Sequence, residues 1–300
     1  MNEVKRGFKK KTIEKTISKK IAEWLKTIPD ELQELVKNDY IVTGGAICSM
    51  LQGDLPNDYD VYLKTPVVAQ KLAEHYIKKL ATTDKVSEIE AKIERDRVRI
   101  VIKSAGIVFD DSQSLSEYQY FEQLSPTEME QYFDKYAVKK IEPYTPALIT
   151  CNAISLHGDV QIIIRFVGAP EEIHKNYDFV HCTNWFTDKG GLVLNQAALE
   201  STMSRELVYV GSLYPICTMF RIKKFIERGW TITAGQMLKI AWDISNLDLS
   251  DIDVLREQLV GVDAAYFHQV ITLLKNREDI DRTYLWEVVS RVFDSNEFDL

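Results

Sequence analysis

The most informative stretch of this chain is Tyr40-Ile-Val-Thr-Gly-Gly-Ala-Ile-Cys-Ser-Met-Leu-Gln-Gly-Asp-Leu-Pro-Asn-Asp-Tyr-Asp-Val-Tyr-Leu63. Residues 40–42 are typical of a buried strand, Gly44-Gly45 of a turn, and residues 46–52 of a short helix. A phosphate can approach a glycine backbone closely, and the N–H groups at a helix start are free to bind it. The stretch therefore predicts a phosphate-binding turn at Gly44 and Gly45.

Two carboxylates follow the turn. Asp58 and Asp60 lie two apart in residues 58–63, where charged and apolar side chains alternate as in a strand with one polar face. Both carboxylates are therefore expected on one face, with Tyr59 and Val61 on the other. Mg²⁺ binds through one or two carboxylates plus substrate phosphates, and two such ions activate an attacking hydroxyl and stabilise a leaving pyrophosphate. We expect Asp58 and Asp60 to hold Mg²⁺, or Mn²⁺ in its place.

The spacing of Gly44-Gly45 and Asp58-x-Asp60 resembles the signature of the DNA polymerase β-like nucleotidyltransferase superfamily. The segment is most similar to the head domain of tRNA nucleotidyltransferases and bacterial poly(A) polymerases, in their divergent phage and viral forms. The resemblance implies an enzyme that takes NMP from an NTP, ATP or CTP, and releases pyrophosphate. It also implies an RNA 3′ end as the acceptor, with tRNA as the first candidate.

The resemblance extends more loosely over residues 38–230. Residues 160–166 are similar to a family strand that ends in an arginine, and residues 205–229 are similar to the nucleotide-recognition helices. The helix after Pro215 has a basic stripe, which either binds phosphates or balances the negative charge of the rest of the protein. Arg165, at the end of the strand, either contacts a triphosphate or forms an ion pair with an acidic residue. Together with the glycines, the expected nucleotide-binding residues are Ser49, Arg165, Arg205, Arg221 and Lys224.

A third carboxylate is used by the family on a neighbouring strand, where this sequence has Gln161. We predict Asp178 as the third catalytic and metal-binding residue, and Asp159, in an expected hairpin turn, is the alternative. Cys48 and Ser49 stand where tailing enzymes carry Arg-Asp. The acceptor is therefore open between RNA, a protein, a small molecule and a second nucleotide, and a catalytically silent nucleotide- or RNA-binding module is a further alternative.

The remaining patterns indicate an α+β fold, a nucleotidyltransferase-type mixed sheet with flanking helices and a helical region toward the C-terminus. The expected domains are 1–37 (basic helical segment), 38–191 (catalytic, with an insertion at about 110–146) and 192–300 (helical). The expected helices are 12–27, 30–38, 66–80 and those from 196 onward. The expected strands are 97–103 with 106–109 as a hairpin, 147–156 with 160–167 as another, and 177–185.

Charge is unevenly distributed along the 300 residues. The net charge is −8, but residues 1–27 contain nine Lys or Arg against three Glu, so this segment carries +6 and the remainder −14. The basic segment either contacts RNA phosphates or is a solvated helix face. The sequence contains no run of 18 or more apolar residues, so we expect no membrane-spanning helix. The N-terminus lacks the apolar core of a secretory signal. We expect a cytoplasmic protein, in the host cytoplasm if phage-encoded; its oligomeric state is open.

Overall fold

The structure is a computed structural model, and the residues it describes are 6–80, 89–94, 97–103, 118–120, 142–149, 153–249 and seven single residues between 251 and 290. Within these ranges, no helix is long and apolar enough to cross a membrane.

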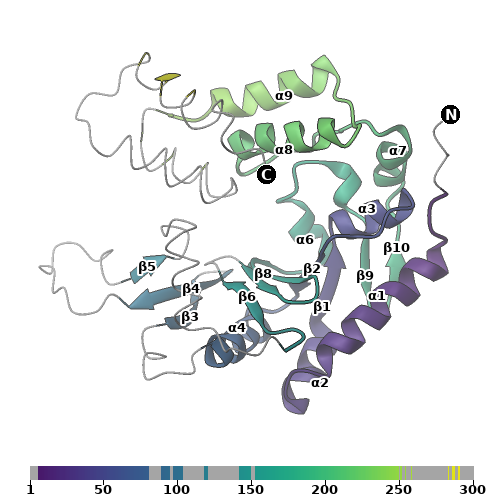
Figure 1. Cartoon of the computed structure of the whole chain (residues 1–300). Coiled ribbons are helices and arrows are strands. Elements are labelled where there is room, and N and C mark those ends of the chain that lie inside the picture. The colour runs from purple at the N-terminus through teal and green to yellow at the C-terminus, as the bar shows by residue number, and fades with distance from the viewer. Residues whose placement is uncertain are drawn as a thin grey trace, which may run out of the picture.

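A seven-stranded mixed sheet lies at the centre of the molecule (Figure 1). Its strand order is β10-β9-β1-β2-β8-β7-β6, and β2 pairs with β8 in parallel, whereas the other neighbours are antiparallel. A three-stranded sheet, β3-β4-β5, lies beside it. The strands are β1 (Tyr40–Thr43), β2 (Tyr59–Leu63), β3 (Ile89–Glu94), β4 (Arg97–Lys103), β5 (Tyr118–Tyr120), β6 (Pro146–Ile149), β7 (Ala153–Leu156), β8 (Val160–Val167), β9 (Trp185–Thr187) and β10 (Gly191–Val193).

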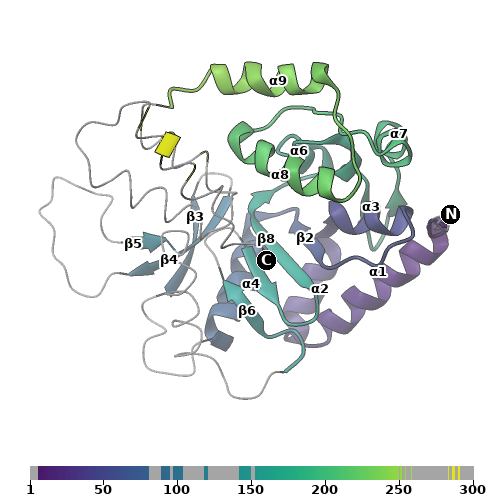
Figure 2. The same ribbon diagram turned by 45° about the horizontal axis from the view of Figure 1, so that its top comes forward.

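Helices flank the central sheet. The purple helices α1 and α2 run along one side of it. The green helices α8 and α9 lie at the end of the molecule opposite α2, with α8 beside α6 and α9 further out (Figures 1 and 2). The helices are α1 (Lys10–Leu25), α2 (Asp30–Asp39), α3 (Gly45–Leu51), α4 (Pro66–Leu80), α6 (Pro170–His174), the 3₁₀ turn η3 (Val180–Cys182), α7 (Gln196–Ser204), α8 (Pro215–Glu227) and α9 (Ala234–Ser245).

The main core covers one face of the sheet. Tyr59, Val61 and Leu63 of β2 point into it and meet the apolar stripe of α1 and the buried side of α4. Trp24 of α1 also donates a hydrogen bond of 2.7 Å to the buried Tyr76 hydroxyl of α4. Burying a large apolar side chain contributes about 1.5–3 kcal/mol, so this face fixes which side of β2 faces inward.

The opposite face of the sheet carries the polar side chains. Ile41 and Tyr62 pack there against Ile173 of α6, and Asp60 points to this side because it alternates with Tyr59 and Val61. A third cluster joins Cys48 of α3 to the C-terminal region; its other buried members are Phe179, Leu207, Tyr209, Trp230 and Ile240. The outer side of α3 is thereby attached to the segments around α8 and α9.

The predicted α+β class, with a mixed sheet and helices toward the C-terminus, is confirmed. The expected helices at 12–27, 30–38, 46–52 and 66–80 are present within a residue or two, and strand β2 begins at Tyr59 rather than Asp58. The apolar periodicity of these elements is local, which is why sequence alone locates them.

The predicted strand 97–103 is confirmed as β4, and two other predicted strands differ in the structure. Residues 97–103 form β4, but β4 pairs with β3 and β5; the expected partner 106–109 lies outside the described residues, as does most of the insertion 110–146. Residues 147–156 are two antiparallel strands, β6 and β7, rather than one. Of the predicted strand 177–185, only Trp185 lies in a strand, as the first residue of β9. The chain turns at η3 instead, so that the Cys182 carbonyl accepts hydrogen bonds from Gly44 N–H and the Thr43 hydroxyl.

Candidate active site

Gly44 ends β1 in a conformation that only glycine adopts easily. Its φ is +93° and its ψ is −149°, a region closed to L side chains. A Cβ at Gly44 would lie 2.9 Å from Oδ2 of Asp60. Gly45, in contrast, is exposed and a Cβ there would meet nothing within 4 Å. The turn therefore rests against Asp60 at its first glycine and opens outward at its second.

Asp58 and Asp60 lie at the start of β2. Asp58 precedes the strand and is exposed, whereas Asp60 is partly buried on the polar face of the sheet. Burial and, to a lesser extent, the neighbouring charge of Asp58 together raise the pKa of Asp60 to about 7. Neither carboxylate forms an ion pair within the described part of the chain. The two carboxylates thus bring acidic groups together, and no described Lys or Arg forms an ion pair with either of them.

The strand beside Asp60 carries an amide at the matching position. The parallel register of β2 and β8 pairs Asp60 with Gln161, so the adjacent strand supplies no carboxylate there. Asp159 adopts a positive φ of 63° in the β7–β8 turn, and its carboxylate forms an exposed ion pair of 3.4 Å with Lys20 of α1. The alternative third carboxylate therefore points to α1.

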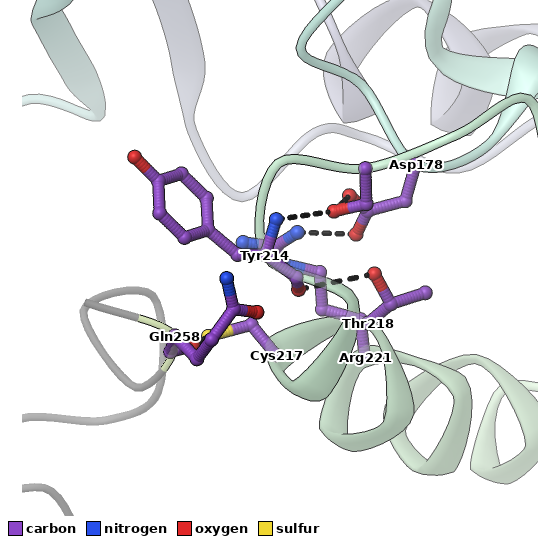
Figure 3. Close-up of polar contacts among 7 residues, drawn as sticks. Asp178, Tyr214, Cys217, Thr218, Arg221 and Gln258 are labelled. Atoms are coloured by element: carbon purple, nitrogen blue, oxygen red, sulfur yellow. Dashed lines mark hydrogen bonds and ion pairs between the residues drawn. The ribbon is translucent and has the colours of Figure 1, made fainter. Parts of the chain in front are cut away.

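Asp178 is buried, and its carboxylate already has partners. Its side chain is 3% exposed and forms an ion pair with Arg221 of α8, and the Ser212 hydroxyl donates a hydrogen bond of 2.8 Å to it. Figure 3 shows the Arg221 side chain extending from α8 to the carboxylate of Asp178. Across the described ranges, no three His, Cys, Asp or Glu side chains gather as a metal site would need. The metal role of Asp178 stays a prediction.

The other predicted residues are dispersed. The Arg165 guanidinium contacts Tyr214, donating to its hydroxyl and lying 4.5 Å from its ring centre. Arg205 ends α7 in a left-handed conformation with φ of 52°, and Lys224 is exposed on α8. Arg165 and Lys224 line neither of the two cavities described next.

Two cavities meet at the glycine turn, and both include Gly45 and Phe225. The smaller has a volume of about 220 Å³; Gly44, Asp60, Asp178 and Arg221 line it. The larger has a volume of about 1190 Å³ and runs along the outer side of α3; Ser49, Asp58 and Arg205 line it. The turn and the carboxylate pair therefore separate two chambers.

Sequence reasoning missed several residues of these cavities. Tyr177 lies in the smaller one, with its hydroxyl 3.6 Å from where a Gly44 Cβ would be. His181, Phe225 and Trp230 line the larger one. Phe225 falls within the segment that resembles nucleotide-recognition helices, but aromatic side chains belong to cores more often than to sites. No local pattern marks His181, because its neighbours come from distant segments.

Comparisons with known proteins give one family and a few distant likenesses. A model of the Gabija anti-defense 2 family proteins matches residues 15–205. The curated protein "Gabija anti-defense 2" of Bacillus phage SPbetaL7 is 21% identical over 139 residues, which is 46% of this chain and 35% of that protein. This chain thus matches about a third of that relative's length.

Two solved structures also align with the chain, both of CCA-adding enzymes. The Thermotoga maritima enzyme complexed with tRNA is 11% identical at a TM-score of 0.40 and covers 92% of this chain and 53% of its own. An apo form is 12% identical at a TM-score of 0.39, covering 93% and 54%. Both likenesses are weak, and nothing about activity follows from them. The match over residues 15–205 does decide the family: this chain belongs to the Gabija anti-defense 2 family.

Proposed function

We propose that the chain is a metal-dependent nucleotidyltransferase that moves NMP from an NTP to an acceptor hydroxyl, with an RNA 3′ end, tRNA first, as the leading acceptor. The observation that carries the proposal is the contact of the Gly44-Gly45 turn with a buried carboxylate that no described cation neutralises. A phosphate-binding turn and a metal-binding carboxylate pair are the two parts that nucleotidyl transfer requires.

The carboxylate pair fits a divalent cation. Burial and the charge of Asp58 raise the pKa of Asp60, and a cation that the two residues share would remove this electrostatic cost. Asp58 and Asp60 would hold Mg²⁺ or Mn²⁺, which supplies charge neutralisation for the transferred phosphoryl group. With two protein carboxylates, the remaining ligands are expected from the NTP phosphates and water.

The protein's own part in the reaction is to position the substrates. Gly45 N–H donates to no described residue and is free for a phosphate oxygen, while Asp178 holds the Arg221 guanidinium in the same cavity. An acceptor hydroxyl forms a bond from its oxygen to the α-phosphorus. The bond between that phosphorus and the bridging oxygen breaks, pyrophosphate leaves, and the hydroxyl proton passes to water.

The family name gives the biological setting. Members are named for activity against the Gabija defence, so we propose that nucleotidyl transfer is the chemistry by which this protein acts on that defence. Modification or consumption of a nucleotide or nucleic acid during phage growth would serve such a role.

A second candidate is a catalytically silent nucleotide- or RNA-binding module. One observation favours it: the strand neighbour of Asp60 is Gln161, and Asp178 is neutralised by Arg221. A site that keeps only two carboxylates can still bind a metal–nucleotide complex without transferring it.

Labelled substrates decide between the two candidates. The purified chain is incubated with Mg²⁺ or Mn²⁺ and each α-labelled NTP, with and without total tRNA. We expect label in RNA, its loss in EDTA, and loss to background in Asp58→Asn and Asp60→Asn. Asp188→Asn, an exposed acid outside both cavities, is the matched control and should transfer normally. Absence of transfer to every acceptor, with NTP affinity unchanged in Asp60→Asn, would leave the binding module.

A further inference from the structure

The floor of the larger cavity contains the imidazole of His181, whose ring nitrogens lack hydrogen bonds among the described residues. His181 is 1% exposed, and its ring lies 4.7 Å from that of Phe225 and 4.3 Å from that of Trp230. Neither ring nitrogen forms a hydrogen bond with any residue that the structure describes. A buried polar group left unsatisfied is energetically unfavourable, so the arrangement favours a ligand that supplies the missing partners.

The state of this imidazole suits a nucleobase. Burial lowers the pKa of His181 to about 4, so at neutral pH one ring nitrogen donates a hydrogen bond and the other accepts one. The edge of a nucleobase carries both a hydrogen-bond acceptor and a hydrogen-bond donor, which can pair with these two nitrogens. Phe225 and Trp230 add aromatic side chains, and a base of any sequence can stack on the face of such a ring.

The rim of the cavity carries two arginines. Arg205 and Arg228 both line it and are exposed, and neither forms an ion pair inside the described ranges. They lie near each other, because a Cβ on Gly229 would be 3.4 Å from Nη1 of Arg205. A guanidinium binds phosphate oxygens in a bidentate manner, so the rim is suited to the phosphate of a nucleotide whose base lies deeper.

We propose that this cavity binds the acceptor, and that the acceptor is a nucleotide, free or at the end of an RNA strand. The assignment of the acceptor rests on the proposed function. Gly44, Asp60 and Arg221 line the smaller cavity, whereas Asp58 lines the larger one. A donor triphosphate on the glycine turn and an acceptor nucleotide beside α3 would thus approach the carboxylate pair from two sides.

Binding without metal tests the site directly. The full chain is titrated in EDTA with AMP, GMP, CMP and UMP, and with short fluorescent single-stranded RNAs ending in each base. A monophosphate carries no triphosphate, and EDTA removes the metal that the Asp58–Asp60 site is expected to need, so the site beside α3 is measured alone. Binding of the monophosphates would identify a free nucleotide as the ligand, and binding of RNA alone would identify a strand end.

Two substitutions should weaken this binding, and a third should not. His181→Phe keeps the aromatic packing and removes the ring nitrogens, and Arg228→Glu removes a rim cation; each is expected to lower affinity about tenfold or more, which corresponds to about 1.4 kcal/mol. Lys223→Glu makes a comparable change of charge on α8 outside both cavities and should change affinity less than about twofold.

Stability separates loss of the site from loss of the fold. Since His181→Phe removes two unsatisfied buried nitrogens, its melting temperature should equal or exceed that of the wild type. Should this variant fail to fold, Arg228→Glu decides the question. The proposal is wrong if no nucleotide or RNA binds, or if both substitutions leave binding unchanged.

Catalysis is measured separately with the same variants. Asp60→Asn should keep nucleotide binding in EDTA and lose label transfer. Transfer without nucleotide binding at His181 refutes this site and leaves the proposed function intact. Binding without transfer refutes the proposed function and leaves the site intact.

Discussion

At the scale of single residues, the two glycines of the turn have different tasks. Gly44→Ala places a methyl group 2.9 Å from Oδ2 of Asp60 in a backbone region closed to alanine, and we expect it to lower the free energy of unfolding by about 1–3 kcal/mol. Gly45→Ala meets no neighbour, so its stability should change by less than about 0.5 kcal/mol.

Denaturant unfolding and NTP titration test this pair. Gly45→Ala should fold normally and still bind NTP more weakly, because its methyl group occupies the open side of the turn where a phosphate would approach. Equal stability of the two variants would show that Gly44 is not conformationally constrained, and unchanged NTP affinity of Gly45→Ala would remove the turn from the binding site.

The buried histidines give the protein a pH-dependent stability. Burial lowers the pKa of His174 and His181 to about 4, against about 6.5 in an unfolded chain. Between these values the unfolded state binds more protons, so the free energy of unfolding falls as pH drops from 6.5 to 4. For His181 the loss is at most about 3 kcal/mol.

Comparison of His181→Phe with the wild type isolates this contribution from that of the carboxylates. Unfolding is measured between pH 7 and 4 for both proteins. The variant should lose less stability on acidification than the wild type. Parallel curves would mean that His181 takes up its proton equally in the folded and unfolded states.

At the scale of elements, the sequence predicts what is local and misses what is distant. The strand, glycine turn, helix and second strand of residues 40–63 were predictable, because their periodicity and turn residues are contiguous. Strand β3 was missed although Ile89, Ala91 and Ile93 alternate with charged residues. The pairing of Asp178 with Arg221 joins positions 43 residues apart, and no local pattern encodes it.

Asp178 either anchors Arg221 of α8 or binds a metal ion, and substitutions at the two positions distinguish these roles. Arg221→Met would leave a buried carboxylate uncompensated, so we expect a loss of about 3–5 kcal/mol in stability. Asp178→Asn should also destabilise, and the double variant should be more stable than the sum of the two single effects predicts.

Transfer by Asp178→Asn distinguishes the two roles. If Asp178 anchors Arg221, the folded variant keeps measurable though reduced transfer and an unchanged Mg²⁺ dependence, which is the outcome that its existing partners favour. A loss of transfer as complete as that of Asp60→Asn, with a raised Mg²⁺ requirement, would instead make Asp178 the third metal ligand that the family resemblance implies.

At the scale of the whole molecule, charge is divided between one helix and the rest. Lys11, Lys15 and Lys19 project from the exposed side of α1, and the exposed Lys26 directly follows it. The segment has a net charge of +6 on a protein of net charge −8. Such a stripe attracts polyanions to one edge of the protein, while the acidic remainder of the surface repels them.

If α1 contacts RNA phosphates, affinity must fall with salt. Each phosphate contacted on a single strand changes the slope of log K against log salt by about −0.7, so three contacts give a slope of about −2. Lys11→Glu with Lys15→Glu should flatten the slope and weaken RNA binding, while mononucleotide binding stays unchanged because α1 does not line the larger cavity. Lys37→Glu with Lys189→Glu, exposed lysines of other elements, controls for net charge. Equal slopes for both double variants would show that α1 is only a solvated face, and RNA would then have to be held by the cavity beside α3 alone.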